Sequence, residues 1–228
     1  MQPYLFPYLG YFQLINKVDK FVIYDDVQYI KGGWINKNRI LLNGGYSNIG
    51  IPVMKDTIKK KINERYFVQD TLQYRTRLLR QLENAYKKAP FFEEIFSYIS
   101  KILFYEERNV AKFNTWVLSE LCRLLKITTP FYLSSEIKKE NSCAGEEKVI
   151  NLNQVMGSNV YINSVGGKEL YHRESFLKAG ISLKFLVTDA YEYRQYDNVF
   201  VPDLSIIDLL MFNSIESMNN LLNKFHLE

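Results

Sequence analysis

The spacing of hydrophobic residues changes near residue 70, and the chain before that point has no helical period. Residues 20–24 form a short run of apolar and β-branched side chains, which predicts a buried strand that ends at two aspartates. Asn43-Gly44-Gly45 predicts a hairpin turn, with residues 47–53 as the returning strand. We therefore expect mainly strands in this part of the chain.

Residues 71–126 show the spacing of amphipathic helices instead. Three helices are predicted, over 71–88, 91–105 and 110–126, and Pro90 separates the first two. We interpret these helices as an insert or lid within a single domain that spans residues 1–228.

The remaining chain alternates strands and helices. The pattern predicts strands over 128–133, 159–163 and 181–187, and helices over 145–156, 174–179, 206–213 and 215–226. The order of strand, loop and helix predicts an α/β fold, with a mostly parallel, Rossmann-like sheet, helices on both faces and the helical insert.

The opening residues differ from the rest because Pro3 and Pro7 exclude an ordinary helix. They predict a shaped loop that turns at Gly10 and leads into a helix from Tyr11. Such a loop points unpaired N–H groups at an anion, although the same aromatic residues would equally suit a hydrophobic plug. The candidate ligand-binding residues are Gln2, Pro3, Tyr8, Gly10, Tyr11 and Gln13.

Asp25 and Asp26 follow the first predicted strand, at the end where α/β sheets bind ligands. They could bind Mg²⁺, hold a sugar hydroxyl or accept a proton from a substrate amine. A solvated strand end or a helix cap is the simpler alternative. Both aspartates are candidate catalytic residues.

The segment after these acids joins glycine flexibility to amide, indole and cationic groups. Arg39 is the third candidate catalytic residue, as a partner for phosphate, and Trp34 would stack on a base or sugar. A β-turn leading into a basic surface strand is the alternative. The further candidates for substrate binding in this segment are Gln28, Lys31, Asn36 and Asn38.

Two later segments follow predicted strands. We interpret Ser134, Ser135 and Glu136 as ligand-binding groups or a helix cap, because neither histidine forms a recognisable triad with the serines. Gly166, Gly167 and Lys168 would cradle an anion, although their spacing is not that of a Walker loop. Asp208 is expected to lie inward, on the first of the final helices.

Composition narrows the class of protein. The chain has 228 residues, a formal charge of +4, 17 tyrosines and 15 phenylalanines, so some rings are expected to line a groove. The two cysteines lack metal-ligand spacing, which argues against zinc and a disulfide scaffold and favours a cytoplasmic location. No apolar run is long enough to cross a bilayer.

Several motifs resemble those of the WbqC-like family of bacterial surface-polysaccharide gene clusters. They are the run from Gln2 to Phe12, Phe21 to Tyr29, Trp34 to Arg39, Tyr132 to Glu136, Tyr161 to Lys168 and Phe200 to Asp208. The resemblance extends through the whole chain. It also implies a short apolar strand before Gln2-Pro3, and this chain departs from that pattern because it begins at those residues.

The opening loop is also similar to the nucleotide-binding loop of class I nucleotidylyl transferases. Tyr8-Leu9-Gly10-Tyr11 stands where that loop has H-x-G-H, so the similarity covers its shape while both imidazoles are absent.

The resemblance implies a transferase that modifies a nucleotide-linked amino sugar in O-antigen biosynthesis. In its more specific form, this hypothesis is the transfer of an acyl or aminoacyl group to the sugar amine, with ATP and Mg²⁺ activating a carboxylate. The cofactors are otherwise unknown. A non-catalytic module that binds a sugar intermediate or a partner enzyme is the alternative, and nucleic-acid binding ranks last. The expected binding partner is a nucleotide-linked sugar, and neither a membrane nor nucleic acid is expected as a partner. The protein could also form a homodimer.

Overall fold

The computed structural model describes residues 1–140, 142–196 and 199–228 and shows a mixed α/β fold. The helices are α1 (Leu9–Lys17), α2 (Thr71–Tyr86), α3 (Phe92–Leu103), α4 (Val110–Leu124), α5 (Gly145–Val155), α6 (Arg173–Lys178), α7 (Ile206–Phe212) and α8 (Ile215–Leu221). The strands are β1 (Phe21–Ile23), β2 (Lys37–Leu42), β3 (Gly45–Gly50), β4 (Phe131–Leu133), β5 (Val160–Ser164), β6 (Ser182–Thr188) and β7 (Phe225–Leu227). Three 3₁₀ turns complete the set: η1 (Ile62–Glu64), η2 (Ser134–Glu136) and η3 (Val165–Leu170).

The described strands form three small sheets, where the sequence predicted one mostly parallel sheet. β1 pairs with β4 in parallel, β2 with β3 in an antiparallel hairpin, and β6 lies between parallel β5 and antiparallel β7. The α/β class is confirmed, but half of these pairings are antiparallel, and the described strands do not form a single Rossmann-like sheet. The pairing of strands depends on contacts between distant segments, which local patterns do not encode.

The C-terminal helix is shorter than predicted. α8 ends at Leu221, and residues Phe225–Leu227 form β7 rather than a last helical turn. β7 pairs with β6 through Leu227 and Leu186, so packing against a sheet edge decides the conformation of a segment whose apolar residues also suit a helix.

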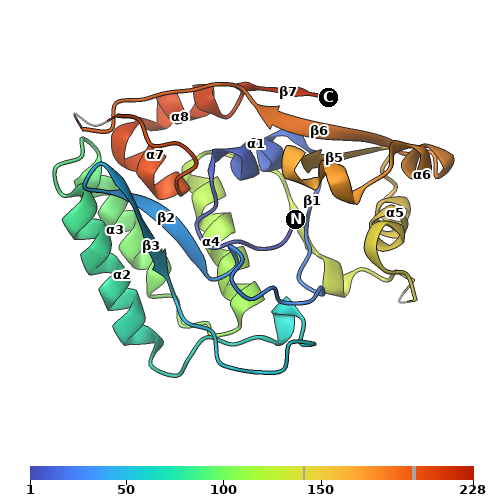
Figure 1. Ribbon diagram of the computed structural model, residues 1–228, viewed down its shortest axis with the longest axis horizontal. Helices are drawn as coiled ribbons and strands as arrows, with labels where there is room; N and C mark the ends of the chain where they lie inside the picture. Colours follow the sequence, from blue (N-terminus) through green and yellow to red (C-terminus); the bar gives the residue numbers. More distant parts are fainter. Residues whose placement is uncertain (141, 197–198) are drawn as a thin grey trace.

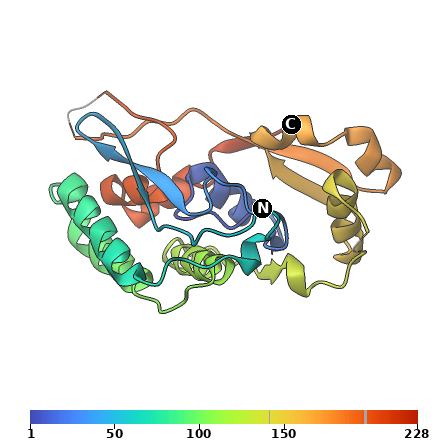
Figure 2. The same ribbon diagram turned by 60° about the horizontal axis from the view of Figure 1, so that its bottom comes forward.

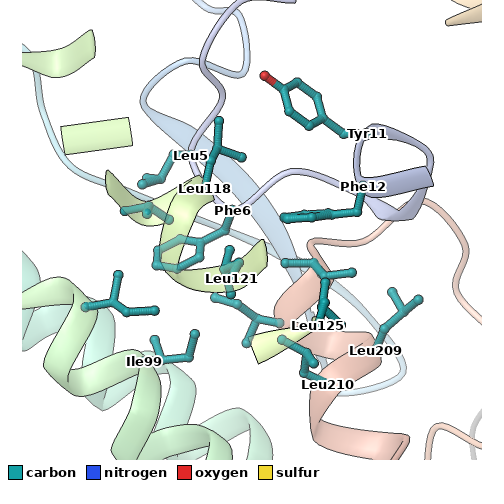
Figure 3. Packing of buried hydrophobic residues seen from close by; sticks show 14 of the residues in the cluster. Leu5, Phe6, Tyr11, Phe12, Ile99, Leu118, Leu121, Leu125, Leu209 and Leu210 are labelled. Atoms are coloured by element: carbon teal, nitrogen blue, oxygen red, sulfur yellow. The ribbon is translucent and has the colours of Figure 1, made fainter. Parts of the chain in front are cut away.

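Figures 1 and 2 show the helices α2 and α3 at one end of the molecule and α5 and α6 at the other, with α1 and α4 between them. The predicted helices of residues 71–126 are present as α2, α3 and α4. Their buried faces belong to the same hydrophobic cluster as the opening loop and α7. Figure 3 shows Leu5, Phe6 and Phe12 packed among Leu118, Leu121 and Leu210 of this cluster. A second, smaller cluster joins α5, α6 and β6 and includes Val149, Phe176 and Phe185.

Buried polar side chains hold the opening loop on the core. The Asn38 amide donates to the carbonyls of Leu5 and Phe6 at 3.0 and 2.8 Å, and Asn114 on α4 donates to the carbonyl of Pro3 at 2.8 Å. Phe6 adopts a φ of 46°, which is unfavourable for a residue with a β-carbon. We infer that these hydrogen bonds fix the shape of the loop.

Within the described residues, no helix has the length and apolar character needed to cross a membrane.

Candidate functional site

A cleft of about 1180 Å³ lies between β1 and β5. The opening loop, the end of α1 and residues 20–24 form one wall, and α5, β5 and η3 form the other. The cleft slightly exceeds the usual size range of ligand pockets, so a nucleotide-linked sugar would fit.

The lining of the cleft brings together three of the segments selected from the sequence. Tyr8 of the opening loop, Trp34 and the pair Gly166 and Gly167 all line it, as does Gln2. These segments are distant in the chain and meet where β1 and β5 end, which is where open α/β sheets bind ligands.

Asp25 follows Tyr24 of the cleft lining, but its carboxylate is already satisfied by the protein. Its two oxygens accept hydrogen bonds from the N–H and the hydroxyl of Ser135, at 3.0 and 2.6 Å, and from the Asn63 amide at 3.3 Å. The residue is only 2% exposed. These hydrogen bonds connect the end of β1 to η2, so Asp25 has a structural role.

Asp26 lies between two lysines. Its Oδ2 is 2.9 Å from the ammonium of Lys139 and 3.1 Å from that of Lys148. Burial opposes ionisation, but hydrogen bonds from Lys139, Ser134 and Lys148 outweigh it and lower the pKa of Asp26. With the adjacent carboxylate of Asp25, the group holds two carboxylates and two ammonium groups. Lys148, whose side chain is 15% exposed, is the ammonium group that an anionic substrate could reach, because the Lys139 side chain is only 3% exposed.

Tyrosines connect this charged group to the cleft. Lys148 lies 5.2 Å from the ring centre of Tyr24, which lines the cleft together with Tyr161 and Tyr171. Burial, followed by the charge of Asp26, raises the pKa of Tyr24, so its hydroxyl stays protonated at neutral pH. Protonated phenols offer hydrogen bonds to phosphate or sugar oxygens.

Arg39 stacks on two aromatic rings, and its guanidinium forms no ion pair with any residue that the structure describes. Its guanidinium lies 4.9 Å from the ring of Trp34 and 4.5 Å from the ring of Tyr46. Its buried Nε has no hydrogen-bond partner within the described residues. Trp34 lines the cleft, whereas Arg39 lies behind it.

A model of the WbqC-like protein family matches residues 2–220. The chain belongs to the WbqC-like protein family. It is similar to the uncharacterized protein Rv1507c of Mycobacterium tuberculosis, with 32% identity over 207 residues that cover 90% of this chain and 88% of the relative. No solved structure matches the chain.

Several candidate residues of this WbqC-like protein have structural contacts. Tyr11 is buried and donates to the carbonyl of Gln2, and the Gln13 amide donates to the carbonyls of Leu221 and Lys224. A β-carbon on Gly10 would lie 2.8 Å from the Tyr8 ring, so close packing requires glycine there. The Asn36 amide donates to the carbonyl of Ile51, while Pro3 and Asn38 belong to the bonds that hold the opening loop.

The other candidates lie outside the cleft. Gln28, Lys31 and Glu136 are exposed, and Gln28 donates to the carbonyl of Ile58. Ser134 is fully buried, and its carbonyl accepts a hydrogen bond from Lys139. The Lys168 ammonium pairs with Glu228, at the edge of the β5–β6–β7 sheet.

The sequence did not single out Lys139, Lys148, Tyr24 or Glu146. Glu146 lines the cleft and contacts His172, and the pKa of its carboxyl is lowered: burial opposes ionisation, but hydrogen bonds from His172 and Ser175 outweigh it. Lysines and glutamates on a polar helix normally indicate a solvated face, so no local signal distinguished them. The position of α5 beside Asp26 and the cleft gives Lys148 and Glu146 a part in the site, whereas Lys139 reaches Asp26 from the segment after η2.

Metal binding does not fit the paired aspartates. Across residues 1–140, 142–196 and 199–228, no three His, Cys, Asp or Glu side chains come together as a metal site. Asp25 already accepts hydrogen bonds at both oxygens, and Oδ2 of Asp26 is bound by two ammonium groups, which would repel a divalent cation. The Oδ1 atom of Asp26 has no hydrogen-bond partner among the described residues, but one carboxylate oxygen does not make a metal site.

Proposed function

We propose that this chain is a transferase that modifies a nucleotide-linked amino sugar in bacterial surface-polysaccharide (O-antigen) biosynthesis. The supporting observation is the cleft lined by tyrosines, Trp34 and a glycine pair, with Lys148 of the Asp26 group beside its Tyr24. Aromatic faces suit a base or a sugar, and an ammonium group suits a diphosphate.

In this proposal Lys148 attracts the anionic part of the substrate, and Trp34 stacks on its base or sugar ring. Asp26 positions the two ammonium groups. Its lowered pKa makes it a weak acceptor for the proton of an attacking amine, so we assign it the positioning role first.

The transferred group in the sharper form of the proposal is an acyl or aminoacyl group, joined to the sugar amine after ATP activates its carboxylate. ATP would bind through the same aromatic and cationic side chains as the nucleotide-linked sugar. We assign no residue to Mg²⁺, because both oxygens of Asp25 and the Oδ2 atom of Asp26 are already bound, which leaves only the buried Oδ1 atom of Asp26 without a partner among the described residues. The two free cysteines support the proposed cytoplasmic location.

The experiment incubates the purified chain with nucleotide-linked amino sugars, acyl donors and ATP, and follows the sugars by mass spectrometry. The matched substrates carry a hydroxyl in place of the amine. We expect a mass increase only for the amino sugars. A folded protein that produces no mass change with any acceptor would contradict the transferase proposal.

A pair of lysine variants tests the site itself. Lys148→Met should weaken nucleotide-sugar binding by about tenfold, a loss of about 1.4 kcal/mol, because an ammonium beside the cleft is removed. Lys101→Met is the control, since Lys101 is exposed on α3 at the other end of the molecule. If both variants bind nucleotide sugars equally well, Lys148 is not part of the binding site.

The satisfied carboxylate of Asp25 favours a second candidate, a module that binds a sugar intermediate without turnover. Asp25 offers no free oxygen as a general base at the position expected from the sequence. Calorimetric binding of nucleotide sugars without any product by mass spectrometry would support this alternative.

A further inference from the structure

Two turns near η1 expose isoleucine side chains to solvent. Ile30 begins a turn that is closed by the hydrogen bond from the Gly33 N–H to the Ile30 carbonyl. Ile58 lies in a second turn, which the hydrogen bond from the Lys60 N–H to the Thr57 carbonyl closes. Ile30 is 58% exposed and Ile58 is 73% exposed. A single exposed apolar residue is ordinary, but two on neighbouring turns indicate an interaction surface.

Hydrogen bonds hold these two turns side by side. Gln28 and Lys61 form an antiparallel bridge between the two segments, and the Tyr29 N–H donates to the Lys60 carbonyl at 3.1 Å. The side-chain amide of Gln28 also donates to the carbonyl of Ile58, at 2.9 Å. Because the backbone of both turns is fixed in this way, a partner that binds the isoleucines does not have to order the turns first.

Lysines flank both isoleucines. Residues 28–33 and 55–64 carry five lysines and two carboxylates, which gives them a formal charge of +3. Among the described residues, the Lys60 ammonium pairs with Asp56 at 2.7 Å, whereas Lys31, Lys55 and Lys59 form no ion pair. These three lysines are exposed. The two segments therefore form a lysine–isoleucine surface, in which apolar side chains project from a positively charged surround. Figure 1 shows the segment around residue 60, in cyan, at the edge of the molecule opposite β6 and β7.

We propose that the lysine–isoleucine surface docks on an anionic lipid membrane. The isoleucines would enter the boundary between headgroups and acyl chains, while the unpaired ammonium groups bind lipid phosphates. Charge complementarity favours an anionic occupant, and the projecting aliphatic side chains favour lipid over nucleic acid, because isoleucine offers no aromatic face on which a base could stack.

A membrane is a partner that the sequence did not predict. The chain has no apolar run that could cross a bilayer, but docking on the surface of a bilayer requires only projecting apolar residues and a cationic surround. Neither isoleucine lines the cleft, and the five lysines of this surface do not line it either. Membrane docking therefore goes beyond the proposed transferase function and would stand if that function failed.

The test measures co-sedimentation of the full chain with vesicles made of equal parts of phosphatidylglycerol and phosphatidylcholine. Vesicles of phosphatidylcholine alone supply the neutral comparison. Ile58→Ser removes an apolar contact, and Lys59→Gln removes an ammonium group. The controls are Leu177→Ser and Lys178→Gln on α6, since Leu177 is 74% exposed and Lys178 is its exposed neighbour. Thermal unfolding verifies that each variant is folded.

We expect the wild-type chain to bind the anionic vesicles and not the neutral ones. Ile58→Ser should weaken this binding by about tenfold and Lys59→Gln by about fivefold, while both controls bind as the wild type does. Ile30→Ser should reproduce the loss, and it replaces Ile58→Ser if that variant unfolds.

The proposal is overturned if the wild-type chain does not bind the anionic vesicles or binds both kinds of vesicle equally. It is also overturned if the isoleucine variants bind as the wild type does, or if the α6 controls lose as much binding as the variants of the surface. Binding of an oligonucleotide in place of vesicles, weakened by Lys59→Gln but not by Ile58→Ser, would overturn it in favour of nucleic acid.

Discussion

The carboxylate of Asp25 accepts two hydrogen bonds from Ser135, one from the backbone N–H at 3.0 Å and one from the hydroxyl at 2.6 Å. The two residues follow the paired strands β1 and β4, so this contact closes the end of a two-stranded sheet. Hydrogen bonds to a buried charged group contribute more than those between neutral groups.

Asp25→Asn should therefore lower the free energy of unfolding by about 2 kcal/mol, because an amide cannot accept at both positions. Urea unfolding measures the change. Glu136→Gln is the control, since Glu136 is an exposed neighbour of Ser135. An unchanged stability of Asp25→Asn would mean that the carboxylate is free for another task.

Tyr86 is a second buried connection, between α2, β2 and α7. Its hydroxyl accepts from the Leu41 N–H at 3.0 Å and donates to Asp208 at 2.7 Å. Tyr86→Phe removes the partner of both the Leu41 N–H and the Asp208 carboxylate. It should lower the free energy of unfolding by about 3 kcal/mol. The control is Tyr66→Phe, because Tyr66 is 48% exposed. Equal unfolding midpoints for the two variants would refute the prediction.

The glycine pair of the cleft lining supplies a matched comparison. A β-carbon at Gly167 would lie 2.5 Å from the Nδ2 atom of buried Asn163, whereas one at Gly166 would have no atom within 4 Å. Gly167→Ala should lower stability by about 1 to 2 kcal/mol and weaken nucleotide-sugar binding, because Asn163 must move. Gly166→Ala should preserve both, as measured by thermal unfolding and calorimetry. If Gly166→Ala lost more stability and binding than Gly167→Ala, the backbone near η3 would differ from this geometry.

The lowered pKa of Asp26 predicts a stability change in acid. An unfolded aspartate has a pKa near 3.9, so the stabilisation is complete above that pH and is lost as the pH falls through the lower folded value. The wild-type chain should lose more stability than Asp26→Asn between about pH 5 and pH 2. Urea midpoints across this range measure the difference, with exposed Asp19→Asn as control. Parallel curves for wild type and Asp26→Asn would contradict the lowered pKa.

The two cysteines should react at very different rates. Burial raises the pKa of the Cys122 thiol to about 12, whereas Cys143 is partly exposed beyond η2. In the native protein at pH 8, an alkylating reagent should modify Cys143 while Cys122 reacts only after unfolding. Mass spectrometry of labelled peptides measures both rates, and Cys143→Ser should abolish the rapid phase. Rapid labelling of Cys122 would show that α4 opens locally.

Local patterns predicted most elements, because periodicity, prolines and turn glycines act over a few residues. Asn43 and Gly44 both have positive φ values, of 52° and 75°, as the predicted hairpin turn requires. The helices of residues 71–126 and the strand before Asp25 were also found in place. Family membership was equally visible in the sequence.

Only the tertiary structure decided which polar residues face the cleft. Tyr8 and Tyr11 are three residues apart and chemically alike, yet Tyr8 lines the cleft while Tyr11 is buried in the core. Lys139 and Lys148 gained their part because their segments lie beside Asp26, more than 110 residues earlier in the chain. The sequence by itself determined most local elements and the family, whereas the conformation of Phe225–Leu227 and the charge and shape of the site depended on long-range packing that no local pattern contains.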